Sequence, residues 1–329
     1  EFNYTKGNCA HCHEQHASIG GSEPDPIVGP NKYLLFSPNY TSQTSGFCFD
    51  CHKGIDSFQY GGYIYNRSYS YRAGGWTNDS LSSIQDAFLL SSSHNLYDIR
   101  NFIDGKWGYT SDSNPCVACH NPHRAQGDPA NDPDSSKNPS TRGWPVSRPS
   151  KHSKDNTEWG LWGDDSNERM SYYTSNYQAP YRYDSTTTYE PDGSTTTDGS
   201  NLTDYVTFCT DCHSYDPPPY SSTLGRKLRR INWSEYGDKH GKNPRSETIL
   251  KPPYDVNATN NYVLSCTDCH EPHGSPNYCY LIRMEVNGGT TNVNENTSTA
   301  WRTFCSRCHY REHTGRSCIE CHYHGSGNF

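Results

Sequence analysis

Apolar positions are sparse along this chain and rarely recur with the period of a helix or a strand. Only 31% of the 329 residues are hydrophobic. The run Ser83–Leu90 is the best helix candidate ahead of His94. Little else has a convincing period, so the pattern predicts mostly irregular coil with few strands.

Two long stretches are polar throughout. Residues 126–150 are rich in Pro, Asp, Asn and Ser, a composition typical of loop. Residues 184–204 contain two runs of three threonines, and we expect a low-complexity surface excursion or short hairpin there. We expect residues 1–329 to form a single unit.

One short motif, Cys-x-x-Cys-His, recurs seven times and consumes fourteen of the fifteen cysteines. We number the copies 1 to 7 in chain order. Their cysteines are Cys9 and Cys12, Cys48 and Cys51, Cys116 and Cys119, Cys209 and Cys212, Cys266 and Cys269, Cys305 and Cys308, and Cys318 and Cys321. Their histidines are His13, His52, His120, His213, His270, His309 and His322.

This motif is the attachment unit of c-type haem. The two thiols add to the porphyrin vinyl groups as thioethers, and the adjoining imidazole becomes the proximal ligand of the iron. A lone CxxC pair often marks a zinc knuckle or a disulfide. A histidine directly after all seven pairs is far too regular for chance, so the sequence predicts seven covalently bound haem c groups and a multihaem cytochrome c.

The composition agrees with a core built from haem. The chain has 26 Tyr against 10 Phe and 2 Met, which leaves little aliphatic material for a large core. Stacked porphyrins would supply the missing apolar surface, and Tyr suits it because its ring packs while its hydroxyl reaches water or a propionate. We expect a haem-stack core with short helices at the haem motifs.

The sixth position of each iron must come from the nine remaining histidines, because only two methionines exist. His11 lies inside a CxxC loop and is a poor ligand. His313 and His324 compete for the last place, and His313 is favoured. The predicted distal ligands are His16, His94, His123, His152, His240, His273 and His313.

Three of these candidates, His16, His123 and His273, follow a motif histidine by three residues. On a helix such residues share a face about 5–6 Å apart. The two axial nitrogens of one haem lie on opposite sides of a rigid ring. Each of these histidines must therefore ligate a different haem, or none, and the pattern would hold two haems close together.

Charge and hydropathy limit the partners. The formal net charge is −8, and haem propionates would make the protein more acidic, which argues against nucleic acid. The basic run at residues 225–230 is better explained by pairing with propionates or by a solvated face. No apolar run is long enough to span a membrane. Haem is attached to CxxCH outside the cytoplasm, so we expect an exported, extracellular or cell-surface protein with its signal peptide removed.

At several of these residues the chain resembles the filament-forming extracellular cytochromes, the cytochrome nanowire family. The similar segments are Cys9–Gly21, His94–Leu96, Cys119–His123, Cys266–His273 leading into Leu281–Arg283, and Phe304–His309. The resemblance implies that His16 ligates a haem of the adjacent subunit, which would join protomers head to tail. Motif 7 and the segment from about 130 to 205 depart from the family pattern, so the haem that receives His16 stays open, with a C-terminal haem as the expectation.

The first hypothesis is therefore a polymer that conducts electrons through seven bis-His haems to extracellular acceptors or other cytochromes, with no catalysis. A soluble monomeric shuttle is the second. A multihaem reductase is the third, and it would need an iron with an open position, which seven regular motifs and abundant histidines disfavour. Cys279, outside every motif, is expected to be a buried structural thiol rather than an intersubunit bridge or a metal contact.

Overall fold

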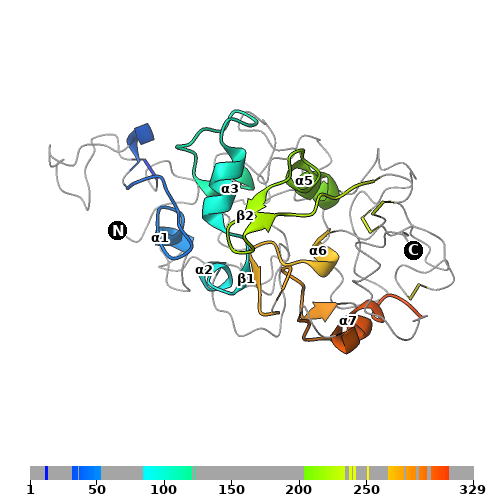
Figure 1. Cartoon of the computed structure of the whole chain (residues 1–329). Coiled ribbons are helices and arrows are strands. Elements are labelled where there is room, and N and C mark those ends of the chain that lie inside the picture. Colours follow the sequence, from blue (N-terminus) through cyan, green and yellow to red (C-terminus); the bar gives the residue numbers. More distant parts are fainter. Residues whose placement is uncertain are drawn as a thin grey trace, which may run out of the picture.

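The computed structural model places short helices and two-stranded ribbons on a long irregular chain (Figure 1). It describes residues 12–13, 32–35, 37–52, 84–120, 122, 204–233, 237–238, 240–241, 250–251, 266–277, 279–286, 289–294 and 298–310. The stretch 126–150, expected to be loop, and residues 184–203 of the expected surface excursion lie outside these residues, while Asp204 begins a helix. No helix in the described ranges is both long and apolar enough to cross a membrane.

Helices coincide with the haem motifs wherever motifs 2 to 6 are described. The helix α1 (Phe49–His52) ends on a motif histidine, and so does α5 (Asp204–His213). The 3-10 helix η3 (Pro115–Ala118) and the helix α6 (Cys266–Cys269) include motif cysteines, and α7 (Ser298–Cys305) ends on one. A further 3-10 turn, η2, spans Lys32–Leu34.

Two further helices lie between motifs 2 and 3. The helix α2 (Ile84–Phe88) falls inside the stretch where the sequence predicts one. The helix α3 (Leu96–Ile103) is a finding that sequence reasoning missed. It begins because the Asn95 side chain accepts hydrogen bonds from the first free backbone amides, and its apolar residues recur three and seven positions apart.

The strands form three antiparallel pairs of two residues each. They are β1 (Ser92–Ser93) with β4 (Gly274–Ser275), β2 (Tyr220–Ser221) with β3 (Arg226–Lys227), and β5 (Glu285–Val286) with β6 (Gly289–Thr290). The β1–β4 pair joins segments about half the chain apart in sequence. It is the most consequential of the three, because one histidine follows β1 and another precedes β4.

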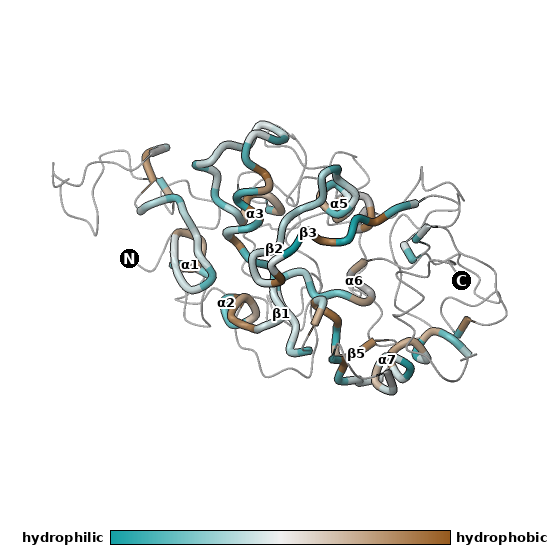
Figure 2. Tube along the Cα trace, in the orientation of Figure 1, coloured by the Kyte–Doolittle hydropathy of each residue, from teal (hydrophilic) through white to brown (hydrophobic). Residues whose placement is uncertain are grey.

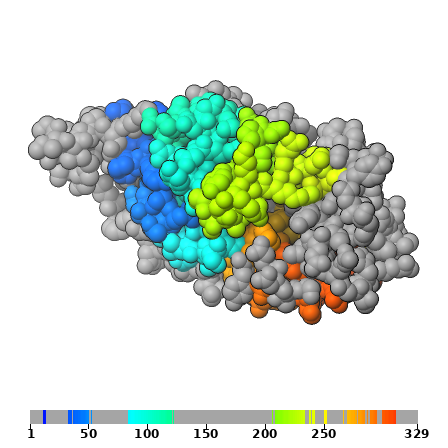
Figure 3. All heavy atoms as spheres, viewed as in Figure 1, coloured from blue at the N-terminus to red at the C-terminus, as the bar shows by residue number. Residues whose placement is uncertain are grey.

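The hairpin of β2 and β3 packs on α3. The backbone amide and hydroxyl of Ser222 both donate to the Asp98 carboxylate, at 2.7 and 2.9 Å. Figure 3 shows the hairpin and α3 side by side on one face of the molecule. Two hydrogen bonds to the first turn of α3 therefore anchor the hairpin in addition to its own short ladder.

Among the described residues, apolar side chains gather in three small clusters rather than in one large core. One lies around Ile103 and Tyr109, one around Phe49 and Phe88, and one around Trp301. Figure 2 shows that the hydrophobic stretches along the Cα trace are short and separated from one another. The motif cysteines border two of the clusters: Cys119 and Cys209 pack against the first, and Cys269, Cys305 and Cys308 against the third.

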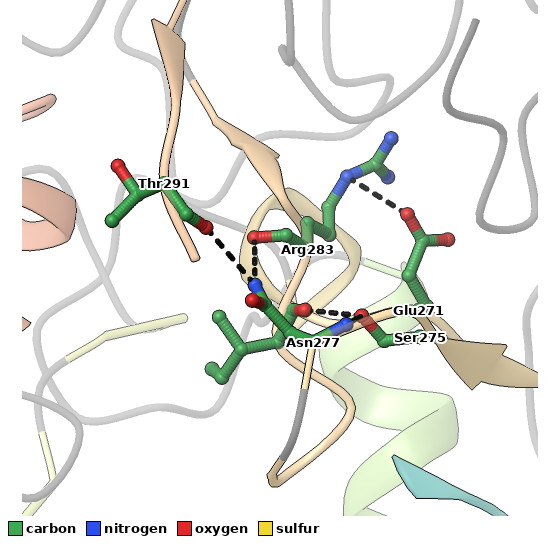
Figure 4. Close-up of polar contacts among 6 residues, drawn as sticks. Glu271, Ser275, Asn277, Arg283 and Thr291 are labelled. Carbon is green, nitrogen blue, oxygen red and sulfur yellow. Dashed lines mark hydrogen bonds and ion pairs between the residues drawn. The ribbon is translucent and has the colours of Figure 1, made fainter. Parts of the chain in front are cut away.

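A buried polar frame organises the segment that follows motif 5 (Figure 4). The Asn277 amide donates to the carbonyls of Arg283 and Thr291, at 3.1 and 3.2 Å, and accepts from the Val293 amide at 2.8 Å. Asn277 is 1% exposed, so these bonds replace its lost hydration. The frame fixes the path of the chain from motif 5 to β6.

Candidate functional site

Among the described residues, three pairs of histidine rings lie close together. His120 and His273 have ring centroids 6.1 Å apart, His240 and His309 are also 6.1 Å apart, and His94 and His213 are 6.3 Å apart. Each pair joins one motif histidine to one histidine that the sequence nominates as distal. Every distal candidate that the structure describes takes part, and each faces a different motif.

The separation of the rings fits an iron between them. With metal–nitrogen bonds of about 2.0 Å, and about 1.15 Å from each nitrogen to its ring centre, two axial imidazoles have centres about 6.3 Å apart. Ordinary aromatic packing covers roughly 4.5–7 Å, so the distance alone does not decide. The pairing does add weight, because no two motif histidines and no two distal candidates form such a pair among the described residues.

The β1–β4 ribbon brings two of the distal candidates together. The backbone amide of His94 donates to the carbonyl of His273 at 3.1 Å, directly beyond the paired strands. The two rings then diverge, one toward His213 and one toward His120. A single ribbon therefore places one distal candidate against the histidine of motif 3 and one against the histidine of motif 4.

His273 also illustrates the expectation for the CHxxH pattern. It follows His270 by three residues, yet its ring lies against that of His120 in motif 3. This placement is the one that ligation of a different haem requires. Its Nδ1 atom is buried without a hydrogen-bond partner, so the ring retains polar capacity that a bound group or water would satisfy.

The substitution Gly274→Ala tests this ribbon. A Cβ at Gly274 would lie 1.9 Å from the backbone carbonyl oxygen of Ala87, which no rotamer change can relieve. We expect β4 to move away from α2 and the free energy of unfolding to fall by about 3 kcal/mol, the upper end of the usual cost of overpacking.

The matched control is Gly225→Ala in the β2–β3 hairpin. Its Cβ would meet open space, so only the left-handed backbone, φ 64°, is penalised. That penalty is about 1 kcal/mol. Equal midpoints of thermal unfolding for the two variants would show that the close approach of β4 and α2 does not matter.

Backbone carbonyls fix the tautomer of three rings. The Nδ1 atoms of His13 and His270 donate to the carbonyls of Tyr33 and Tyr280, at 2.9 and 2.7 Å, and His94 Nδ1 donates to Pro272. A carbonyl can only accept, so the proton resides on Nδ1 and Nε2 carries the lone pair. This is the usual second contact of a metal-bound histidine.

The loops that supply two of these carbonyls have the same conformation. Tyr33 and Leu34 have φ of 67° and 58°, and Tyr280 and Leu281 have φ of 55° and 56°. The third residue of each loop bridges back to the motif histidine, Leu35 to His13 and Ile282 to His270. Motifs 1 and 5 therefore share one local unit, which a search for Tyr-Leu-Leu or Tyr-Leu-Ile after Cys-His-Glu would have found.

Burial favours the neutral form of three of the paired histidines, His94, His120 and His273. Burial lowers the pKa of His120 to about 4 with help from His52, and lowers the pKa of His273 to about 3 with help from His120 and His94. Burial also lowers the pKa of His94, against the carbonyl of Pro272. Neutral imidazole is the form that binds a metal ion.

The thiols show which motifs are neighbours. The side chains of Cys48 and Cys116 are within hydrogen-bonding reach of each other, as are those of Cys209 and Cys266. Burial raises the pKa of Cys119 to about 12, so this thiol is neutral as well. Motif 2 thus meets motif 3, and motif 4 meets motif 5, through the first cysteine of each.

The exposure of two candidates, and the candidates that the structure does not describe, complete the set. His52 and His240 are exposed. Several predicted residues lie outside the described ranges: Cys9, His16, His123, His152, His313, Cys318, Cys321 and His322, together with the alternative His324. In the part of the chain described, no three His, Cys, Asp or Glu side chains converge as a metal site; the histidines meet in pairs.

The structure also describes the basic run at residues 225–230 and the extra cysteine, Cys279. In the basic run, Arg229 pairs with Asp238 at 2.8 Å and Arg230 with Asp216 at 3.0 Å, so these arginines have protein carboxylates as partners. Cys279 is half-buried and packs on the cluster around Trp301.

Comparison with known proteins gives no relative for the chain: no protein-family model, no curated protein and no solved structure matches it.

Proposed function

We propose that this chain is a multihaem cytochrome c that transfers electrons through seven haems, each ligated by two histidines. The observation that carries the proposal is the set of three ring pairs, each joining a Cys-x-x-Cys-His histidine to a predicted distal histidine at 6.1–6.3 Å. Haem attachment explains the motif, the pair and the spacing together.

Each residue type has a defined task toward the haem. The cysteines would hold the porphyrin, the motif histidine one axial position and its partner ring the other. The haem iron supplies a one-electron couple when bound. Because both axial positions are taken by protein side chains, no position is left for a substrate, and the site favours electron transfer over catalysis.

The described motifs form a continuous series. Thiol contacts link motif 2 to 3 and motif 4 to 5, and the His94–His273 backbone bond links motif 3 to 4. The cysteines of motifs 5 and 6 border one apolar cluster. Haems attached in this order would be close neighbours, which electron tunnelling along the molecule requires.

The polymer is the second part of the proposal. Three pairs account for His94, His240 and His273, which leaves four distal candidates for the four other motifs: His16, His123, His152 and His313. The resemblance to cytochrome nanowires supports His16 as the ligand donated to the next subunit. We propose a head-to-tail filament, acting outside the cell.

The proposal is tested by haem content and spin state. Pyridine haemochrome analysis should give seven haems per polypeptide, and electron paramagnetic resonance should show low-spin signals throughout. A substantial high-spin signal would favour the multihaem reductase. Dispersed particles in negative-stain images, in place of continuous fibres, would favour the monomeric shuttle. Far fewer than seven haems would reject the cytochrome altogether.

A further inference from the structure

Two lysines lie against the motifs in the same manner. The Lys106 ammonium is 5.5 Å from the ring centroid of Tyr215, two residues after the motif 4 histidine. The Lys251 ammonium is 5.5 Å from the ring centroid of Tyr310, directly after the motif 6 histidine. In both cases a cation sits on the aromatic residue that leaves the haem motif.

Both ammonium groups are also anchored by backbone carbonyls. Lys106 Nζ donates to the carbonyl of Phe102 at 2.5 Å and lies 4.6 Å from the centroid of the same residue's ring. Lys251 Nζ donates to the carbonyl of Ser306, which lies inside the Cys-x-x-Cys loop of motif 6. The backbone of Lys251 continues this contact, because its amide donates to the Cys308 carbonyl at 2.7 Å.

The aromatic rings around Lys106 attract its ammonium group but do not neutralise its charge. Phe102 and Trp107 each pack edge to face on Tyr215 and are tilted against each other, with ring centroids 5.4–6.1 Å apart. Aromatic faces attract a cation through their quadrupole but carry no counter-charge. Both lysines are half-buried, so water screens their fields less than on an open surface.

We propose that Lys106 and Lys251 raise the reduction potentials of the haems at motifs 4 and 6. The inference rests on the proposed function, because it requires haem at those motifs. Reduction adds an electron to the haem, and a fixed cation nearby stabilises the reduced state more than the oxidised state. Asp211, inside the motif 4 loop, carries a negative charge that would lower the same potential. The potential at motif 4 therefore reflects both charges, and substituting Lys106 isolates the contribution of the lysine.

The experiment is a spectroscopic redox titration of the haem-loaded protein. Lys106→Met and Lys251→Met remove one charge each while keeping an apolar stem. In each variant the reduction potential of one haem should fall by about 59 mV, a roughly tenfold change in its reduction equilibrium. The titration curve should therefore lose amplitude at its high-potential end. Lys106→Arg and Lys251→Arg keep the charge and should titrate like the unmodified protein.

Lys227→Met is the matched control. Lys227 is exposed on β3, and its substitution changes the net charge by the same amount. A curve for Lys106→Met and Lys251→Met that matches this control, with full haem content, would overturn the proposal. Loss of haem from the Met variants that the Arg variants do not repair would also overturn it, since it would show a structural role.

Failure of this inference differs from failure of the proposed function. If the unmodified protein carries seven low-spin haems and the titrations coincide, only the role of the lysines is wrong. If the unmodified protein lacks those haems, the proposed function is wrong and the titration has no basis.

Discussion

Replacing His273 with alanine should convert one of the seven haems from low spin to high spin. The ring of His273 stands 6.1 Å from that of His120, its pKa is lowered to about 3 by burial, and its Nδ1 is buried. Alanine would remove the distal imidazole and leave an opening on one face of the motif 3 haem. Electron paramagnetic resonance of the purified variant should show a high-spin signal worth one haem per chain, while haem content stays at seven.

Two additions separate ligand loss from structural damage. Free imidazole should enter the opening and restore the low-spin signal, since it replaces the missing ligand and nothing else. His273→Met should stay low spin with a raised potential, because methionine ligation raises haem potentials. An all-low-spin His273→Ala protein would show that His273 is not an axial ligand and that the 6.1 Å pair is ordinary ring packing.

The second large effect is expected at His16. If His16 ligates a haem of the neighbouring subunit, alanine there removes the coordinate bond that would join the protomers. His16→Ala should abolish fibres in negative-stain images while the seven haems stay attached, because thioether formation does not depend on the distal ligand.

His273→Ala is the matched control for His16→Ala. Both histidines follow a motif histidine by three residues. In both motifs the motif histidine also bonds the carbonyl of a Tyr-Leu loop with positive φ. The partner of His273 lies in the same chain, so its loss should leave fibres intact. Fibres that persist in His16→Ala would remove this assembly mechanism, and fibres lost in both variants would point to general destabilisation.

The sequence predicts the chemistry of this chain better than its architecture. Covalent haem attachment would depend on local spacing alone, so the spacing of cysteine and histidine predicts it without any knowledge of the fold. The nomination of distal histidines rested on counting, which cannot say which ring meets which motif. The pairing of His94 with His213 depends on the β1–β4 ribbon, whose partners lie far apart in sequence and carry no apolar alternation.

The missed helix has a different explanation. The helix α3 begins at a local signal, Asn95, whose side chain accepts from two backbone amides. Its apolar positions, Leu96, Ile99 and Ile103, cover only two turns and are mixed with charged residues. The helical period of hydrophobic residues is therefore too short to stand out in the sequence. The Tyr-Leu loops of motifs 1 and 5 were missed because positive φ at Tyr and Leu is not encoded by glycine or asparagine.

The central claim is that an iron porphyrin lies between each pair of facing histidines. An electron cryo-microscopy map at side-chain resolution tests it most directly. The account predicts flat porphyrin density between His120 and His273, between His94 and His213, and between His240 and His309, with both rings bonded to the central iron. A map in which any of these pairs packs ring against ring, or in which the haem of motif 3, 4 or 6 takes a different distal ligand, would contradict it.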